Sequence, residues 1–81
     1  MEGGHVAIVR SLEVVDDGAQ LHPTEVDCEL KNFVHEGKAY LQISSFGSDR
    51  RQREKKVSQT LQFDPESALK LAAHIQRVFG G

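Results

Sequence analysis

The chain has 81 residues and a mass of 9.0 kDa, which is enough for one domain spanning residues 1–81. Its composition, 38% hydrophobic and 27% charged, is that of a globular protein and excludes a collagen-like repeat or a disordered tail. Since Cys28 is the one cysteine, an internal disulfide is excluded and a reducing, cytoplasmic location is expected.

The first half of the chain predicts two strands separated by a turn-rich connection. Residues 5–15 are rich in β-branched side chains but alternate imperfectly, and Asp16, Asp17 and Gly18 then signal a turn. Residues 24–34 alternate well, with Val26, Cys28 and Leu30 on one side and charged residues on the other. The second segment is therefore expected to be a half-buried strand, with Cys28 as a small core side chain.

The middle of the chain predicts a hairpin and two further strands. Residues 35–37 have the length and the glycine of a hairpin link. In residues 39–46, Leu41 and Ile43 are expected to face inward, whereas the outward positions hold Tyr40, Gln42, Ser44 and Phe46. After a polar loop, residues 57–63 place Val57, Leu61 and Phe63 inward and Ser58, Thr60 and Gln62 outward.

The last element is a helix over residues 65–79. Asp64 is a suitable N-cap, Pro65 suits the first helical position, and Gly80 and Gly81 supply a stop. Helical spacing groups a core stripe of Ala68, Leu71, Ala72, Ile75 and Phe79. The fold expected is α+β, a four-stranded antiparallel sheet followed by one C-terminal helix.

The helix is apolar over more of its circumference than one sheet contact requires. Leu69 and Ala73 lie well to one side of the face that would cover the sheet. An exposed apolar patch of this kind commonly binds a second copy of the same chain. We therefore expect a homodimer with the helices at or near the interface.

Catalytic and metal-binding patterns are absent from the sequence. The four histidines are dispersed without metal-ligand spacing, and His35 and His74 are expected to face solvent. Ser44 and Ser45 have no histidine and aspartate partners nearby, and the glycines form no phosphate-binding loop. The protein is not expected to be an enzyme or to need a metal or cofactor.

The outward face of the third and fourth strands suits unpaired nucleic-acid bases. Two aromatic rings lie among flat hydrogen-bonding groups, and bases need stacking surfaces and edge contacts. Residues 1–47 carry three basic and eight acidic side chains, whereas residues 49–56 hold five positive charges and two negative ones. That loop can bind phosphates, but a solvated hairpin tip explains its charge as well. Asp27 and Glu29 count against binding if they share the outward face.

Segment order and character across residues 24–79 resemble the family of transcriptional positive cofactor four, whose topology plant Whirly proteins share. The resemblance is carried by residues 37–43, the basic loop, residues 56–61 and the helix start at Pro65. It implies a homodimer packed through its helices, with curved sheets forming grooves for single-stranded DNA. By this resemblance, the groove-lining regions of the family correspond to Lys38, Tyr40, Gln42, Phe46, Arg50, Arg51, Arg53, Lys55 and Lys56. The chain lacks the tryptophan and the long basic tail of many members.

The sequence is compatible with two functions. The first is binding of single-stranded DNA or RNA with little sequence preference, as an accessory factor of transcription or replication. Five basic residues would contact phosphates, Tyr40 and Phe46 would stack on bases, and Gln42 and Thr60 would supply hydrogen bonds. The alternative is a small homodimeric protein–protein interaction module with no nucleic-acid role, favoured by the acidic first half of the chain.

Overall fold

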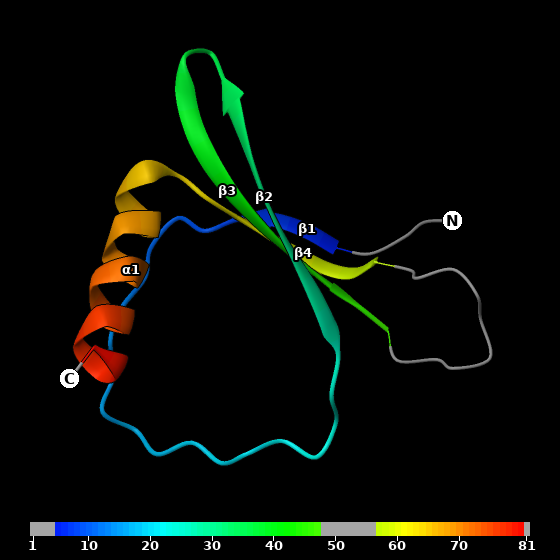
Figure 1. Ribbon diagram of the computed structural model, residues 1–81, viewed down its shortest axis with the longest axis vertical. Helices are drawn as coiled ribbons and strands as arrows, with labels where there is room; N and C mark the ends of the chain where they lie inside the picture. The colour runs from blue at the N-terminus through cyan, green and yellow to red at the C-terminus, as the bar shows by residue number, and fades with distance from the viewer. Residues whose placement is uncertain (1–4, 48–56, 81) are drawn as a thin grey trace.

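The computed structural model describes residues 5–47 and 57–80, and this part of the chain forms an α+β fold (Figure 1). One sheet of four strands is followed by a single helix, in the strand order β1-β4-β3-β2. The elements are β1 (His5–Ile8), β2 (Asp27–His35), β3 (Lys38–Phe46), β4 (Val57–Phe63) and α1 (Pro65–Phe79). The predicted fold class is confirmed, and the bounds of β4 and α1 match those expected from sequence.

Strands β2 and β3 form a long antiparallel hairpin with a two-residue turn. Glu36 has φ 52° and Gly37 has φ 77°, so both central residues lie in the left-handed region. A two-residue turn with positive φ at both positions has a twist that matches the twist of the flanking strands. The turn fixes the register, and His35 is paired with Lys38 and Phe33 with Tyr40.

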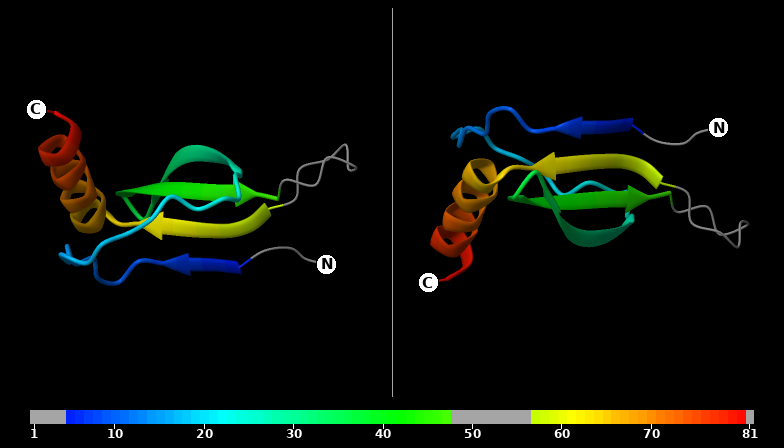
Figure 2. Two further views of the ribbon diagram at one scale, coloured as in Figure 1. Left: turned by 90° about the horizontal axis from the view of Figure 1, so that it is seen from below. Right: turned by 90° about the horizontal axis from the view of Figure 1, so that it is seen from above.

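The sheet is mixed, because β1 pairs with β4 in parallel. The expectation of an entirely antiparallel sheet is wrong for this pair and correct for β2–β3 and β3–β4. β1 also ends at Ile8, before the residue 15 expected. Parallel pairing is possible because residues 9–26 form a long connection that carries the chain across to β2 at the other edge (Figures 1 and 2).

The predicted caps of α1 are confirmed. The Ser67 backbone N–H donates to Asp64 Oδ1 over 2.8 Å, and Pro65 occupies the first turn, where its missing N–H costs nothing. Glu66 lies in the first turn and Arg77 in the last, so both charges complement the helix dipole. The helix lies at one end of the sheet and packs against β3 and β4 (Figure 2).

At the centre of the sheet, the face that was expected to be exposed is buried, and the face that was expected to be buried is partly exposed. Ser44 and Thr60, predicted to face outward, are only 6% exposed, whereas Leu61 and Leu30 are 44% and 68% exposed. Phe63 is buried as predicted. The alternation was assigned correctly at these positions, since Ser44 is paired with Thr60 and Ile43 with Leu61. It fails at Val57, which is paired with Phe46 beyond a register shift between Ser45 and Phe46. The short hydroxyl side chains lie on the two interior strands between longer neighbours, whereas Leu30 lies on an edge strand.

Helix α1 is also rotated relative to the core stripe expected from sequence. Ser67 is buried and Leu71 and His74 are half-buried, while Ala72, Ile75 and Phe79 are exposed. The expectation that His74 faces solvent is therefore wrong. Cys28, expected in the core, is exposed. Much of the predicted apolar surface thus lies outside the core of the single chain.

The chain is open for its mass. Its accessible surface is 7291 Å², whereas a folded monomer of this mass exposes about 4,900 Å². The radius of gyration is 14.8 Å, against about 12 Å for a compact domain of this length. Among the described hydrophobic residues only Phe46 and Phe63 are buried. A single chain thus leaves apolar surface uncovered that a compact domain would bury.

Candidate nucleic-acid interface

An aromatic cluster lies at the turn end of the β2–β3 hairpin. The rings of Phe33 and Tyr40 stack with centroids 5.3 Å apart and planes inclined by 9°. His35 meets Tyr40 edge-on at 6.5 Å, and Lys38 Nζ lies 5.9 Å from the Tyr40 ring centroid. The four side chains share one face, because the cross-strand pairs Phe33–Tyr40 and His35–Lys38 each point to the same side. We call these four residues the hairpin cluster.

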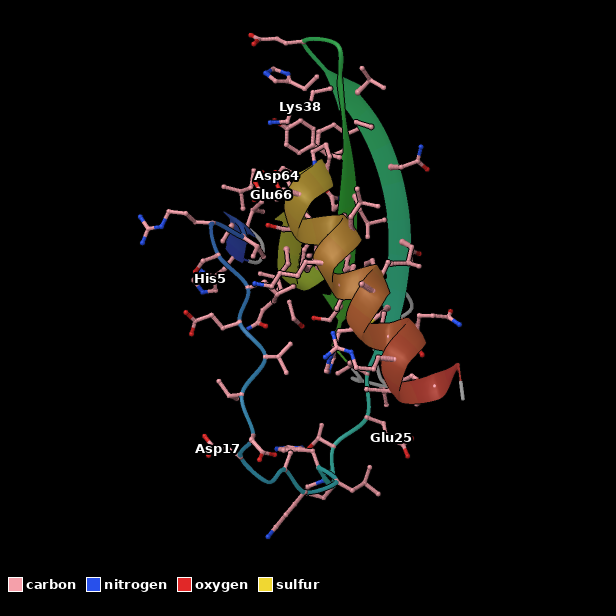
Figure 3. All side chains as sticks on the ribbon, turned by 90° about the vertical axis from the view of Figure 1, so that its left-hand side faces the viewer. His5, Asp17, Glu25, Lys38, Asp64 and Glu66 are labelled. Atoms are coloured by element: carbon pink, nitrogen blue, oxygen red, sulfur yellow. The ribbon has the colours of Figure 1, made fainter. Side chains whose placement is uncertain are left out.

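Charges of both signs surround the hairpin cluster. His35 Nε2 lies 3.7 Å from Glu36 Oε2, and both side chains are largely exposed. Lys38 lies close enough to Asp64 to contribute to its electrostatics, and Figure 3 shows the two near the start of α1. The hydrogen bond from the Ser67 backbone N–H is the main cause of the lowered pKa of Asp64. It outweighs the opposing effect of desolvation, and Lys38 adds to it.

Two polar cross-strand pairs continue the same face along β3 and β4. Gln62 Nε2 donates to Gln42 Oε1 over 2.9 Å, and the hydroxyls of Ser44 and Thr60 bond to each other at 3.0 Å. The glutamine pair is part-buried and the hydroxyl pair is buried. These pairs hold β3 and β4 in register, and of the two pairs only the glutamine amides can be reached by solvent.

The edge of this face is acidic. Glu29 is paired with Ser44, and Asp27 with Phe46, so both carboxylates lie on the side of the sheet that carries Tyr40. Lys31, paired with Gln42, is the basic residue between them and the hairpin cluster. A phosphate backbone crossing β2 at its Asp27 end would meet two negative charges, whereas the turn end offers Lys38 and His35.

The structure separates the predicted contact residues into three groups. Lys38 is exposed, and Tyr40 and Gln42 are half-buried on one accessible strand. Phe46 and Thr60 are buried, at 8% and 6% exposure, so neither offers a free face for a base in this conformation. The five basic positions lie outside the described residues; they are Arg50, Arg51, Arg53, Lys55 and Lys56.

Phe33 and His35 belong to the cluster and were not among the residues predicted from sequence. In the alternation of residues 24–34, Phe33 lies on the side of the strand that carries the charged residues. The two-residue turn at Glu36 and Gly37 is the signal that would have found them. Once that turn sets the register, position 33 must lie opposite Tyr40 and position 35 opposite Lys38.

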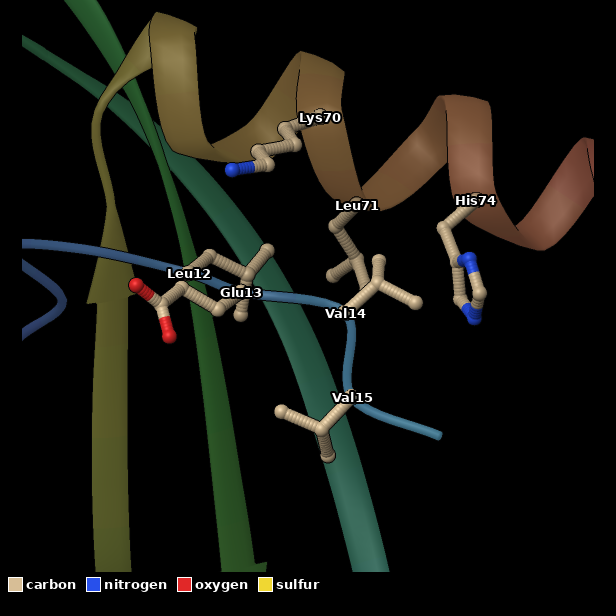
Figure 4. A pocket seen from close by; sticks show the side chains of 7 residues that line it. All are labelled: Leu12, Glu13, Val14, Val15, Lys70, Leu71 and His74. Carbon is tan, nitrogen blue, oxygen red and sulfur yellow. The ribbon is translucent and has the colours of Figure 1, made fainter. Parts of the chain in front are cut away.

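A separate hollow of about 180 Å³ lies between α1 and the connection that follows β1 (Figure 4). Leu71 and His74 of the helix line it together with Leu12, Val14 and Val15 of the connection. Lys70 and Glu13 lie at its polar side. His74 Nδ1 is buried without a hydrogen-bond partner. The hollow is mainly apolar and lies apart from the hairpin cluster.

Within residues 5–47 and 57–80, no group of three or more histidine, cysteine or acidic side chains is arranged to hold a metal ion. The helix found in those residues is neither long nor apolar enough to cross a membrane.

Comparison with known proteins does not assign the chain to a family. No family model, no curated protein and no solved structure matches the chain. The function must therefore be argued from the residues themselves.

Proposed function

We propose that the protein binds single-stranded nucleic acid, DNA or RNA, with little sequence preference. The observation that carries the proposal is the hairpin cluster, in which two stacked rings lie beside Lys38 on an accessible strand face. Unpaired bases stack on aromatic side chains regardless of their identity, and each such contact contributes about 1–3 kcal/mol. Cationic groups beside the rings attract the phosphates that accompany each base.

In this proposal each part of the face has a separate role. The exposed side of the Phe33–Tyr40 pair accepts a base, and Lys38 neutralises a phosphate next to it. Gln42 and Gln62 use the amide groups left over from their mutual bond to contact base edges without selecting one sequence. The buried Ser44–Thr60 pair supports the strands from within and makes no contact with the strand.

The basic positions of residues 49–56 supply the long-range attraction. Five positive charges against two negative ones favour a phosphate backbone, although the whole chain carries a net charge of −2. Neutralised phosphates release counterions, so affinity falls steeply as salt rises. The double variant Arg50→Ala with Arg51→Ala is expected to weaken binding to all sequences and to flatten the salt dependence.

Fluorescence anisotropy with a labelled single strand of about 20 nucleotides tests this function, because phosphate contacts make binding salt-dependent. The titration is run at about 50 and 200 mM salt, two concentrations between which such contacts lose affinity. A duplex of the same sequence is the control. Preference for the single strand, with affinity that falls with salt, supports the proposal. No binding at the lower salt contradicts it.

The proposal includes assembly as a homodimer in a reducing, cytoplasmic setting. The exposed apolar residues of α1 and the large accessible surface support the dimer. The exposed, unpaired thiol of Cys28 is compatible with the reducing setting. As a binder of single strands the protein would act as an accessory factor where strands separate, in transcription or replication.

The second candidate is a protein-interaction module without a nucleic-acid role. The observation that favours it is the apolar surface outside α1, where Leu30, Val34 and Leu61 are exposed on one face of the sheet. Retention on heparin or on single-stranded DNA-cellulose at low salt distinguishes the two candidates. The interaction module predicts no retention on either matrix.

A further inference from the structure

Strand β2 forms an open edge of the sheet. It pairs with β3 along its whole length, and no other strand or helix of the described chain contacts it. All of its residues except Phe33 are exposed. The outer side of an edge strand presents unpaired backbone N–H and C=O groups, which can bind another extended chain. With nine residues, no proline or glycine and a continuous register, this edge is long and regular enough to do so.

The two faces of this edge differ in character. Leu30 and Val34 are 68% and 70% exposed on one face, whereas Glu29 and Lys31 are exposed on the face that carries Tyr40. Neither charged residue forms an ion pair with another of the described residues. A chain added to β2 must therefore offer apolar side chains on the first face. On the second face it must set a base opposite Glu29 and an acid opposite Lys31.

A second copy of β2 meets these requirements. When two β2 strands pair antiparallel about a two-fold axis at Leu30, Glu29 of each copy lies opposite Lys31 of the other. Leu30 then packs against its own copy, and Val34 lies opposite Val26, which is 51% exposed just before the strand. Moving the axis by one residue in either direction sets Glu29 or Lys31 against its own copy, and like charges directly opposite destabilise a sheet. The charges therefore select one register.

We propose that β2 binds β2 of another copy edge to edge, antiparallel and centred on Leu30, so that two sheets join into one. This contact is separate from a dimer through α1, because α1 packs against β3 and β4 and not against β2. It links one homodimer to the next. Main-chain hydrogen bonds supply the affinity of such strand addition, and side chains supply its specificity. A single strand edge is at the small end of interface sizes, so free homodimers pair weakly.

Edge pairing is coupled to the binding of single strands, and this step rests on the proposed function. Homodimers bound side by side on a long strand are held at a high effective concentration, which strengthens a weak contact between them. Lys31 of each copy also offsets the negative charge of Glu29 of its neighbour, on the face that carries the hairpin cluster. Binding to a long strand is therefore cooperative, whereas binding to a strand that holds one homodimer is not.

Disulfide trapping tests the edge pairing without nucleic acid. Leu30→Cys, made with Cys28→Ser, is concentrated and oxidised mildly with diamide. The two copies of position 30 lie directly opposite, with Cα atoms about 4.5–5.5 Å apart, within the range of a disulfide. A crosslink is expected, and it should also form when Phe79→Asp removes the contact through α1.

Val34→Cys with Cys28→Ser is the matched control, because Val34 is as exposed as Leu30 on the same face. Two copies of position 34 lie eight residues apart along the pair, about 27 Å, and should not crosslink. Equal crosslinking of the two variants, or no crosslink from Leu30→Cys, would overturn the pairing whether or not the protein binds nucleic acid.

Charge reversal tests the register on a single strand of about 60 nucleotides, long enough for several homodimers. Lys31→Glu sets carboxylates against each other at both charged pairs and should reduce the cooperativity of binding about tenfold. The double variant Glu29→Lys with Lys31→Glu restores opposite charges and should recover it. A double variant no more cooperative than Lys31→Glu contradicts the register.

A strand of about 20 nucleotides, which offers few binding sites, separates this inference from the proposed function. Wild-type protein that binds both lengths without cooperativity on the longer one contradicts the edge pairing alone. Failure to bind either length contradicts the proposed function, and the crosslink at position 30 then decides the edge pairing by itself.

Discussion

The centre of the sheet and the outer face of α1 differ in a way that sequence alone would not suggest. On β3 and β4 the polar pair of Ser44 and Thr60 is buried, whereas on α1 the apolar Phe79 is 81% exposed. The sheet satisfies its buried hydroxyls within the chain, through their mutual hydrogen bond. On α1, the apolar side chains of Ile75, Val78 and Phe79 are left exposed by the single chain. The buried polar pair is thus satisfied within the single chain, whereas these apolar side chains of α1 are not covered by it.

This difference also separates the two proposed surfaces. The hairpin cluster lies at the turn end of β2 and β3, whereas the exposed apolar residues Ile75, Val78 and Phe79 belong to the second half of α1. Nucleic-acid binding and self-association can therefore be disrupted independently.

Phe79→Asp should abolish dimerisation at micromolar concentration. Burying a phenylalanine side chain contributes about 1.5–3 kcal/mol, and the interface contains two copies of it. The expected loss is therefore a roughly 100- to 10,000-fold weaker dimer. Analytical ultracentrifugation measures it. Leu21→Asp is the matched control, because Leu21 is fully exposed on the connection after β1 and lies outside α1. An equal effect from Leu21→Asp would contradict a dimer packed through α1.

Tyr40→Ala should weaken binding of a single strand by about 5- to 150-fold, the loss expected for one stacked base. Tyr40→Phe keeps the ring and should bind nearly as wild type. Anisotropy at constant salt provides the measurement, and the dimer should persist in both variants. The hairpin cluster is not the binding site if alanine and phenylalanine variants bind equally.

Thr60→Val should destabilise the fold by about 1–3 kcal/mol, because it leaves the Ser44 hydroxyl buried without its partner. The double variant Ser44→Ala with Thr60→Val removes both hydroxyls and should recover part of the loss. Urea unfolding at one protein concentration measures both. Strand binding should be unaffected, since Thr60 is buried; a large loss of affinity in a folded variant would return Thr60 to the contact surface.

Asp64→Ala should cause a small loss of stability at neutral pH, by removing the N-cap of α1. The bond from Ser67 lowers the folded pKa of Asp64 below its ordinary value of 3.8. The stabilisation is therefore complete above that value and is lost as pH falls through the lower folded pKa. Thermal unfolding at pH 7 and in the acid range should show the variant and wild type converging in acid. A constant difference would contradict a titrating cap.

Local signals in the sequence were sufficient for much of the fold. The glycine-containing link over residues 35–37 predicted the hairpin, although its turn is only Glu36 and Gly37 and the register was not predicted. Asp64 with Pro65 predicted the start of α1. Alternation also grouped Ser44 with Thr60 and Ile43 with Leu61 correctly, but it misplaced Val57, which is paired with Phe46 beyond a register shift. Each of these features depends on residues close together in the chain.

The features that sequence missed depend on distant contacts. The parallel pairing of β1 with β4 follows from the path of residues 9–26, which local propensity does not determine. Alternation identifies two faces but does not say which is covered, so Thr60 was expected outside. Likewise, the periodicity of α1 placed Leu71 in one stripe with Ile75 and Phe79. The tertiary structure half-buries Leu71 together with His74 and leaves Ile75 and Phe79 exposed.

Native mass spectrometry with an unlabelled single strand of about 20 nucleotides, long enough to span several stacking and phosphate contacts, tests the central claim most directly. The account predicts a protein species of about 18 kDa, twice the 9.0 kDa chain, that binds the strand as an intact dimer. Phe79→Asp should yield a 9.0 kDa species, and Tyr40→Ala a dimer with little bound strand. A wild-type protein that remains a monomer, or a dimer that never retains the strand, would contradict the account.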